Sequence, residues 1–138
     1  MSLFNSLFGN SEESANKDTN QNGLKWQPLT DINQLDAIVS ESAAKPVVIF
    51  KHSTRCSISR MALKNFEREY NLQESEVAPY FLDLLEHRDI SNEIAQKFQV
   101  IHQSPQLLLI KNGKSVYDVS HSEIDAEALK SKVEALGN

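Results

Sequence analysis

The stretch VVIFKHSTRCSIS, residues 47–59, decides the expected fold of this 138-residue chain. Its first four residues, Val47 to Phe50, are all apolar, and such a β-branched and aromatic run is typical of a strand buried on both faces. A polar segment with Cys56, the only cysteine of the chain, follows directly. The residues from about Ser57 to Tyr70 then have the apolar spacing of a helix. A lone thiol at the junction of a central strand and a helix is therefore the feature to explain.

Strand and helix patterns alternate on both sides of this stretch. Before it, a short strand is expected around Trp26, followed by a helix. Thr30 or Asp31 would cap this helix, Ile32 would be its first apolar position, and Pro46 would end it. After it we expect a strand within 77–87, a helix over 88–100, two strands joined by a turn at 111–113, and a closing helix over 123–136. This order predicts a mixed sheet with parallel and antiparallel strands, covered by helices on both faces.

The first 23 residues differ in composition from the rest of the chain. The stretch NSEESANKDTNQNG, residues 10–23, is polar and almost free of apolar side chains, so it cannot repay the entropy cost of ordering. It is preceded by apolar side chains at helical spacing: Leu3, Phe4, Leu7 and Phe8. These could dock on the domain, on a partner or on a membrane, or belong to a frayed terminus. We expect a flexible polar tail over residues 1–23 and one domain over residues 24–138.

The overall composition argues against several classes of protein. The net charge of -5 disfavours nucleic acid or an anionic membrane as the main partner, because both select basic surfaces. No apolar run reaches the roughly 20 residues that a membrane span needs, and the start of the chain lacks the pattern of a secretory signal. One cysteine cannot form an internal disulfide. A reducing compartment, the cytoplasm, is therefore the expected location.

Cys56 has the sequence surroundings of a reactive thiol. If a helix begins at about Ser57, the sulfur lies over unpaired backbone N–H groups at the positive end of that helix. Arg55 is a neighbouring cation, and His52 could be a second one. These features favour the thiolate, which is the form that attacks disulfides. The alternative is a buried, inert cysteine. Polar neighbours argue against burial: Ser53, Thr54, Arg55, Ser57 and Ser59.

The order of elements, with a cysteine after a central strand and a proline opening the later hairpin, resembles the thioredoxin fold. Within that fold, residues 47–59 followed by HQSPQLLLIKNGK, residues 102–114, resemble the YtxJ family of monothiol bacilliredoxins, whose motif is Thr-Cys-Pro-Ile-Ser after a Lys-His-Ser segment. The positions that fit are Lys51, His52, Ser53, Thr54, Cys56, Ile58 and Ser59. Arg55 stands where the family often has threonine, and Ser57 replaces the proline. The resemblance implies a thioredoxin-like α/β domain over residues 24–138, with a central mixed β-sheet flanked by helices.

The resemblance also implies the activity of a monothiol thiol–disulfide oxidoreductase. Cys56 would remove bacillithiol, or a related low-molecular-weight thiol, from protein mixed disulfides. Thiol-modified proteins would then be its substrates, a small thiol its co-substrate, and no cofactor would be tightly bound. Ser59 stands where a thioredoxin places its second cysteine, so an outside thiol must resolve Cys56. Ser59 could also donate a hydrogen bond to the sulfur or cap the helix.

The other predicted site residues surround the thiol or position a substrate. The thiol environment would be set by His52, Thr54, Arg55, Ser57 and Ser59. The resemblance implies that the Ser104–Pro105 bond is cis and faces the cysteine, so that an extended substrate pairs beside it; the ordinary alternative is a trans proline that begins a strand. Arg55 could bind the anionic malate group of bacillithiol or be a solvated loop charge. His52 could tune the thiol, transfer a proton, or be structural.

Rival functions find less support in the sequence. Four histidines and one cysteine show no paired spacing, so no metal site is expected. An iron–sulfur cluster bridging two monothiol chains usually accompanies Cys-Gly-Phe-Ser, and here Ser57 and Ile58 replace Gly-Phe. The motif of a one-cysteine peroxidase is absent around Cys56. The rival from another class is a thioredoxin-fold binding module without catalysis, which would hold a partner in the groove beside Pro105.

Overall fold

The computed structural model describes residues 24–137, so the predicted tail and its apolar side chains lie outside the described residues. The strands are β1 (Gln27–Pro28), β2 (Val47–His52), β3 (Ala78–Asp83), β4 (Gln106–Lys111) and β5 (Lys114–Ser120). The helices are α1 (Gln34–Glu41), α2 (Ser57–Glu69), α3 (Arg88–Phe98) and α4 (Ala126–Leu136). The order of strands and helices is the predicted one.

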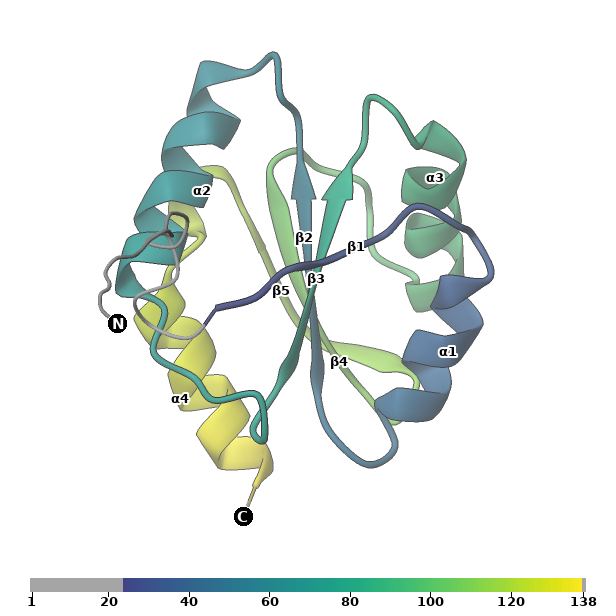
Figure 1. Cartoon of the computed structure of the whole chain (residues 1–138), viewed down its shortest axis with the longest axis vertical. Coiled ribbons are helices and arrows are strands. Elements are labelled where there is room, and N and C mark those ends of the chain that lie inside the picture. The colour runs from purple at the N-terminus through teal and green to yellow at the C-terminus, as the bar shows by residue number, and fades with distance from the viewer. Residues whose placement is uncertain (1–23, 138) are drawn as a thin grey trace, which may run out of the picture.

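β2 is the central strand of the sheet, as its apolar sequence predicts. The strand order is β1-β3-β2-β4-β5, with β1, β3 and β2 parallel and with β4 and β5 antiparallel to their neighbours. All six residues of β2 are buried, because the strand is paired on both edges and covered on both faces. The predicted mixed sheet is therefore confirmed, and Figure 1 shows β2 in the middle of the molecule.

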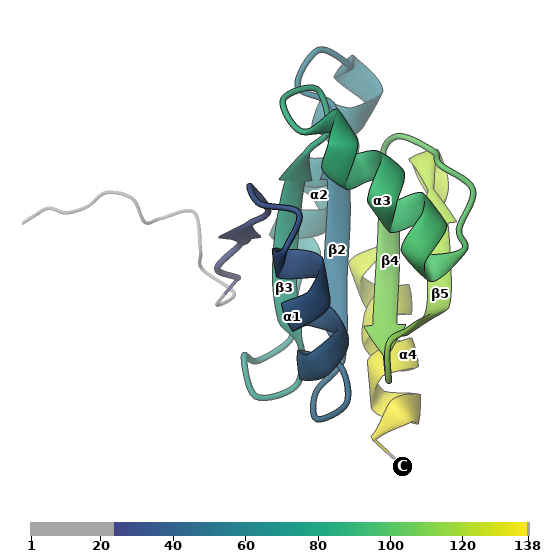
Figure 2. The same ribbon diagram turned by 90° about the vertical axis from the view of Figure 1, so that its right-hand side faces the viewer.

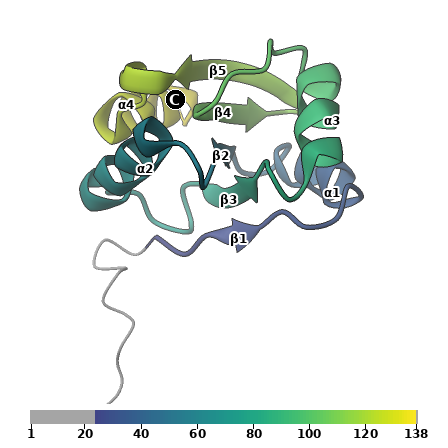
Figure 3. The ribbon, with the colours of Figure 1, turned by 90° about the horizontal axis from the view of Figure 1, so that it is seen from above.

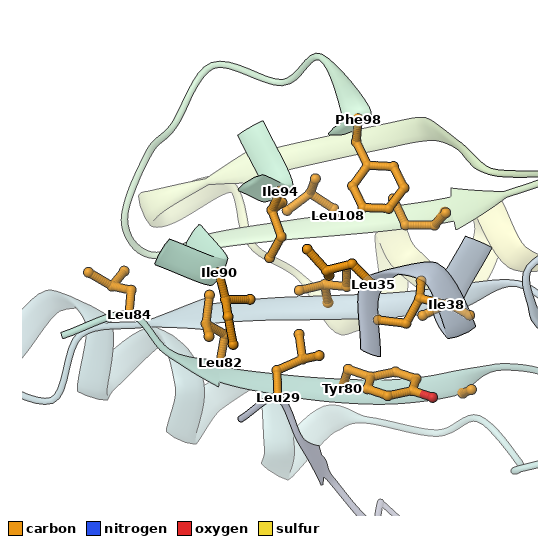
Figure 4. Packing of buried hydrophobic residues seen from close by; sticks show 14 residues of the cluster. Leu29, Leu35, Ile38, Tyr80, Leu82, Leu84, Ile90, Ile94, Phe98 and Leu108 are labelled. Carbon is orange, nitrogen blue, oxygen red and sulfur yellow. The ribbon is translucent and has the colours of Figure 1, made fainter. Parts of the chain in front are cut away.

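Two pairs of helices cover the two faces of the sheet. Figure 3 shows α2 and α4 on one side and α1 and α3 on the other, and Figure 2 looks onto the α1/α3 side. Successive residues of β2 point to opposite faces: Ile49 joins the core under α1 and α3, whereas Phe50 joins the core under α2 and α4. In the first core, Leu35 of α1 and Ile94 of α3 pack with Leu108 of β4 (Figure 4).

The start of α1 differs from the prediction. The residue before the helix is Asn33, whose side chain makes no capping hydrogen bond, but the Asp31 carboxylate accepts one from the Asn33 amide at 2.8 Å, so Asp31 caps the turn that leads into the helix. The Gln34 side-chain oxygen in turn accepts hydrogen bonds from the amides of Thr30 and Asp31, at 2.7 and 2.9 Å. These contacts hold the chain in a turn before the helix begins. Ile32 consequently lies outside the helix, and its side chain is 39% exposed.

The end of α1 also differs from the prediction. The helix stops at Glu41 rather than at Pro46, because the chain turns away to meet the hairpin between β4 and β5. The Ser42 carbonyl accepts a hydrogen bond from the Asn112 amide at 2.9 Å, and the Ser42 hydroxyl accepts one from the Gly113 amide at 2.8 Å. A tertiary contact therefore ends this helix before the proline does.

The closing helix begins later than predicted. α4 starts at Ala126, and Asp125 is its N-cap, accepting a hydrogen bond from the Glu127 amide at 3.2 Å. The preceding residues His121–Glu123 form a short 3-10 turn instead of the first turn of the α-helix. His121 has a positive φ of 56°, a conformation that interrupts a regular strand or helix. The connection from β5 to α4 is thus a loop that contains one 3-10 turn.

Candidate active site around Cys56

Three loops meet at one edge of the sheet. β2 and β3 are parallel and end there, and antiparallel β4 begins there, since Gln106 pairs with Lys51 near the end of β2. The loop with Cys56 and the loop with Pro105 therefore leave the sheet side by side. The β5–α4 connection joins them, because the His121 amide donates a hydrogen bond to the Pro105 carbonyl at 3.1 Å. The topology brings the predicted thiol and the predicted substrate-binding proline to the same edge.

Cys56 is the N-cap residue of α2, a helix of 13 residues. Its backbone is extended (φ -105°, ψ 122°), its side chain makes no capping hydrogen bond, and the residue is half-buried. The Cys56 amide donates to the Ser53 carbonyl at 3.2 Å, and the Cys56 carbonyl accepts from the Arg60 amide at 3.0 Å. The thiol therefore lies at the N-terminal end of a helix without being sealed in the core.

The loop that carries the thiol is anchored by side chains of the first turn of α2. The Ser59 hydroxyl oxygen accepts a hydrogen bond from the Ser53 amide at 3.1 Å. The Arg60 guanidinium donates one to the Thr54 carbonyl at 3.1 Å. Thr54 thus contributes its backbone to this anchor. Ser57, by contrast, is exposed on α2, so the position where the family has proline faces outward.

His52 and Ser59 form a buried pair beneath this loop. The Ser59 oxygen lies 2.8 Å from His52 Nδ1. That oxygen also accepts the Ser53 N–H, so one serine hydroxyl joins the His52 ring to the loop backbone. Burial lowers the pKa of His52; Asp83 opposes this shift and Arg60 adds to it. His52 is therefore a neutral ring that holds Ser59 in place, and the Ser59 hydroxyl is engaged by both His52 and Ser53.

A charged cavity of about 340 Å³ lies beside the thiol loop. Arg55 lines it together with Arg88 of α3, and neither guanidinium forms an ion pair within residues 24–137. The acidic residues Asp83 and Glu86 line the same cavity. The fold thus adds a second arginine to the one that the sequence indicated.

An apolar cavity of about 250 Å³ lies on the other side of the start of α2. Its α2 side is formed by Ile58 and Met61, which are 60% and 66% exposed. The residues that complete it are Ala62, Asn65, His121, Ser122 and Ile124. Exposed apolar side chains next to a half-buried thiol form a surface suited to a protein partner.

The segment from Ile101 to Pro105 leads into β4 at the same edge of the sheet as the thiol loop. The Ser104–Pro105 peptide bond is cis, as the resemblance implies. The Ser104 hydroxyl is buried and has no hydrogen-bond partner within residues 24–137. His102, in the same segment, has its Nδ1 atom 2.8 Å from the Nζ atom of Lys51.

Lys51 lies near the end of β2, beside the site, and sequence reasoning did not assign it a role there. Its side chain is 0% exposed, and burial lowers its pKa to about 8. The available signal was a lysine directly after four apolar residues, in a strand expected to be buried on both faces. Gln106, its partner across β2 and β4, is also buried and was likewise not singled out.

No group of three or more His, Cys, Asp or Glu side chains is placed to hold a metal ion within residues 24–137. None of the helices in this range has the length and apolar character that crossing a membrane requires.

Known structures place this chain in the thioredoxin-fold class. It is 34% identical to a thioredoxin-fold protein to which an oxidoreductase function has been ascribed, with a TM-score of 0.65, covering 78% of this chain and 91% of that one. Thioredoxin Mala s 13 of Malassezia sympodialis is 22% identical, with a TM-score of 0.62 and coverage of 80% and 90%. Spinach chloroplast thioredoxin f (long form) is 18% identical, with a TM-score of 0.61 and coverage of 88% and 93%. The last two show the fold alone.

The family match is more specific than the fold similarity. Residues 27–129 match the family model described as monothiol bacilliredoxin BrxC, and the chain belongs to this family. The bacilliredoxin resemblance of residues 47–59 and 102–114 is therefore confirmed, and the protein is a thiol oxidoreductase.

Proposed function

We propose that this protein removes bacillithiol, or a related low-molecular-weight thiol, from protein mixed disulfides through Cys56. The observation that carries the proposal is the placement of one half-buried cysteine as N-cap of α2, with Ser59 at the position of a second cysteine. Since Ser59 cannot form a disulfide, the chemistry is limited to exchange with outside partners. The cytoplasm, expected from the single cysteine, would supply the resolving thiol.

The proposed reaction has two exchange steps. The Cys56 thiolate attacks the small-thiol sulfur of the mixed disulfide, so that a new S–S bond joins Cys56 to the small thiol and the substrate protein leaves as a thiolate. A second small thiol, as its thiolate, then attacks the sulfur of the small thiol bound to Cys56. Cys56 leaves as a thiolate, and the two small thiols leave as their disulfide. The proton of the attacking thiol goes to solvent in this step. Each step breaks one S–S bond and forms one; overall the resolving thiol is oxidised into the small-thiol disulfide while the substrate sulfur is reduced to a thiol.

Arg55 and Arg88 are the proposed recognition residues for the small thiol. Their cavity adjoins the thiol loop, and neither side chain has an ion-pair partner within residues 24–137. Two guanidinium groups suit the carboxylates of a malate group, because arginine pairs well with planar carboxylates. Asp83 and Glu86 in the same cavity disfavour a ligand that carries only negative charge.

Ile58, Met61 and the backbone of Ser104 are proposed to bind the protein substrate. The first two residues are exposed and form the wall of the apolar cavity. Ser104 precedes Pro105 at the edge where the thiol loop leaves the sheet. An extended substrate segment would therefore contact the apolar cavity on one side of Cys56 and the Ser104 backbone on the other.

Intact mass measured after brief exposure to the disulfides of bacillithiol, glutathione and coenzyme A tests this proposal. We expect rapid gain of one bacillithiol by the wild type and none by Cys56→Ser. A preference for another thiol would keep the exchange mechanism and change the co-substrate. If no disulfide modifies Cys56 and partner proteins bind equally well to Cys56→Ser, the binding module without catalysis becomes the better reading, with the apolar cavity as its partner surface.

The role of the arginines is tested separately. Arg55→Gln and Arg88→Gln should each slow the reaction with bacillithiol disulfide by about tenfold or less, as expected for a partly exposed charged contact. Lys64→Gln, an exposed change on α2, is the matched control for lost positive charge. Equal slowing by all three variants would show general electrostatic attraction rather than a specific contact.

A further inference from the structure

Lys51 is a charged side chain in the core that the thiol chemistry does not use. It lies near the end of β2, paired with Leu82 of β3 and Gln106 of β4, and it is 0% exposed. Within residues 24–137 no carboxylate lies within ion-pair distance of its ammonium group. Burying a charge without a counter-charge is unfavourable. An apolar side chain of similar length would fill this space without that cost, so local stability gives no reason for a lysine here.

The Lys51 ammonium makes its contact in the loop that follows α3. Its Nζ atom lies 2.8 Å from His102 Nδ1, and the Ser91 hydroxyl of α3 lies 3.4 Å from the same nitrogen. Burial lowers the pKa of His102, and the charges of Lys51 and Arg88 lower it further. The ring is therefore a neutral acceptor at Nδ1, which leaves the ring proton on Nε2.

Gln106, the cross-strand partner of Lys51, holds the residues on either side of His102. Its side-chain nitrogen donates to the Ile101 carbonyl at 3.0 Å, and its side-chain oxygen accepts from the Gln103 amide at 3.4 Å. Gln106 is 1% exposed. Two neighbouring buried side chains therefore contact three successive loop residues, and the next residue of that loop is Ser104.

We propose that Lys51 is a positioning residue: together with Gln106 it fixes the segment Ile101–Gln103 and so holds the Ser104 backbone in place for a disulfide substrate. The inference rests on the proposed function for the identity of that substrate. Under this proposal, the last two residues of β2 hold different loops. Consecutive strand residues point to opposite faces, so His52 holds the thiol loop through Ser59 while Lys51 holds the substrate loop through His102.

Lys51→Met tests the proposal, because methionine keeps an unbranched apolar side chain and removes the donor. Lys45→Met is the matched control: Lys45 also donates to one acceptor, the Glu74 carbonyl at 2.7 Å, just before β2 begins. We expect hydrogen–deuterium exchange of a peptide covering residues 99–105 to become roughly fivefold faster in Lys51→Met, as for loss of one hydrogen bond. The Lys45→Met peptide should exchange as in the wild type.

Kinetics provide the second readout. For a bacillithiol–protein mixed disulfide, kcat/KM should fall about tenfold in Lys51→Met, mainly through KM, because the substrate backbone is misplaced rather than the sulfur. His102→Leu removes the exposed partner of the same contact, so it should also give faster exchange and a lower kcat/KM. His102→Asn, which retains an acceptor near the place of Nδ1, should restore most of the wild-type exchange and KM.

Unchanged exchange in a folded Lys51→Met protein would overturn the proposal. So would faster exchange with an unaltered kcat/KM for the mixed disulfide. If the wild type de-thiolates no mixed disulfide, the proposed function fails instead, and exchange alone then decides whether Lys51 holds the loop. If Lys51→Met does not fold, His102→Leu against His102→Asn makes the same decision.

Discussion

The Nδ1 atom of His52 lies 2.8 Å from the hydroxyl oxygen of Ser59, and this contact ties the end of the central strand to the first turn of α2. Cys56 lies between the two residues in the chain, and the Ser53 amide donates to the same serine oxygen at 3.1 Å. Ser59 is fully buried. The residue that replaces a second cysteine is therefore also the residue that anchors the thiol loop.

Ser59→Cys should convert the monothiol site into a dithiol site. The new thiol would lie three residues after Cys56 at the start of a helix, which is the spacing of Cys-X-X-Cys motifs. Oxidation should then remove two hydrogen atoms by intact mass and block alkylation of both thiols. Ser131→Cys, an exposed change on α4, should add a thiol that remains free to alkylate. Two free thiols in oxidised Ser59→Cys would contradict the prediction.

The stability of the protein should fall as the pH falls below about 6.5, the ordinary histidine pKa. Burial lowers the pKa of His52, and burial with nearby positive charge lowers that of His102. Below about 6.5 the unfolded chain binds protons that the folded chain does not, so the free energy of unfolding decreases until the folded pKa values are passed. Urea unfolding of wild type and His52→Asn between pH 7.5 and 5 tests this.

His52→Asn should reduce the pH dependence, because an amide does not titrate in this range. The double change His52→Asn with His102→Asn should reduce it further. Stability that rises on acidification in the wild type, or identical pH profiles in all three proteins, would refute the assignment of these neutral histidines.

Lys51→Met should stabilise the protein at pH 7 while impairing the proposed activity. The pKa of Lys51 is lowered by burial from 10.5 to about 8, so the unfolded chain binds more protons than the folded chain between these values. Wild-type stability should therefore rise above pH 8, and Lys51→Met should lose this rise. At one pKa unit per about 1.4 kcal/mol, the gain at pH 7 is at most about 3.5 kcal/mol.

Thermal or urea unfolding between pH 7 and 9.5 measures this effect. The range stops below about pH 10, where tyrosines begin to ionise. A Lys51→Met protein that is less stable at pH 7 and keeps the wild-type profile would mean that the lysine stabilises the fold.

Gly113→Ala should destabilise the protein by about 1–2 kcal/mol. Gly113 has a positive φ of 76° in the turn between β4 and β5, and an added Cβ would lie 3.2 Å from Cγ1 of Val39. Gly137→Ala is the control, because its Cβ would lie 3.6 Å from the nearest atom, the Glu134 carbonyl oxygen, at an ordinary φ. Equal stability of the two variants in urea unfolding would contradict this reading of the turn.

Sequence reasoning predicted the elements that depend on local chemistry. The all-apolar run Val47 to Phe50 predicted a buried central strand, and the Lys111-Asn112-Gly113 stretch predicted a hairpin, where Asn112 and Gly113 both adopt positive φ. The first and last residues of α1 differ from the prediction because Gln34 and Ser42 form contacts that propensity does not report. Helix ends depend on such partners as much as on capping residues.

Residues that are close together in the chain already indicate a monothiol protein of thioredoxin-like fold. One cysteine follows the central strand, and Ser59 occupies the only position from which a second could close a disulfide with it in that motif. Three pairings are visible only in the folded chain: His52 is a neutral partner of Ser59, Arg88 lines the same cavity as Arg55, and Lys51 contacts His102. These pairs are separated by 7 to 51 positions in the chain. Periodicity and turn chemistry act over a few residues, whereas these contacts exist because β2, β3 and β4 end or begin at one edge of the same sheet.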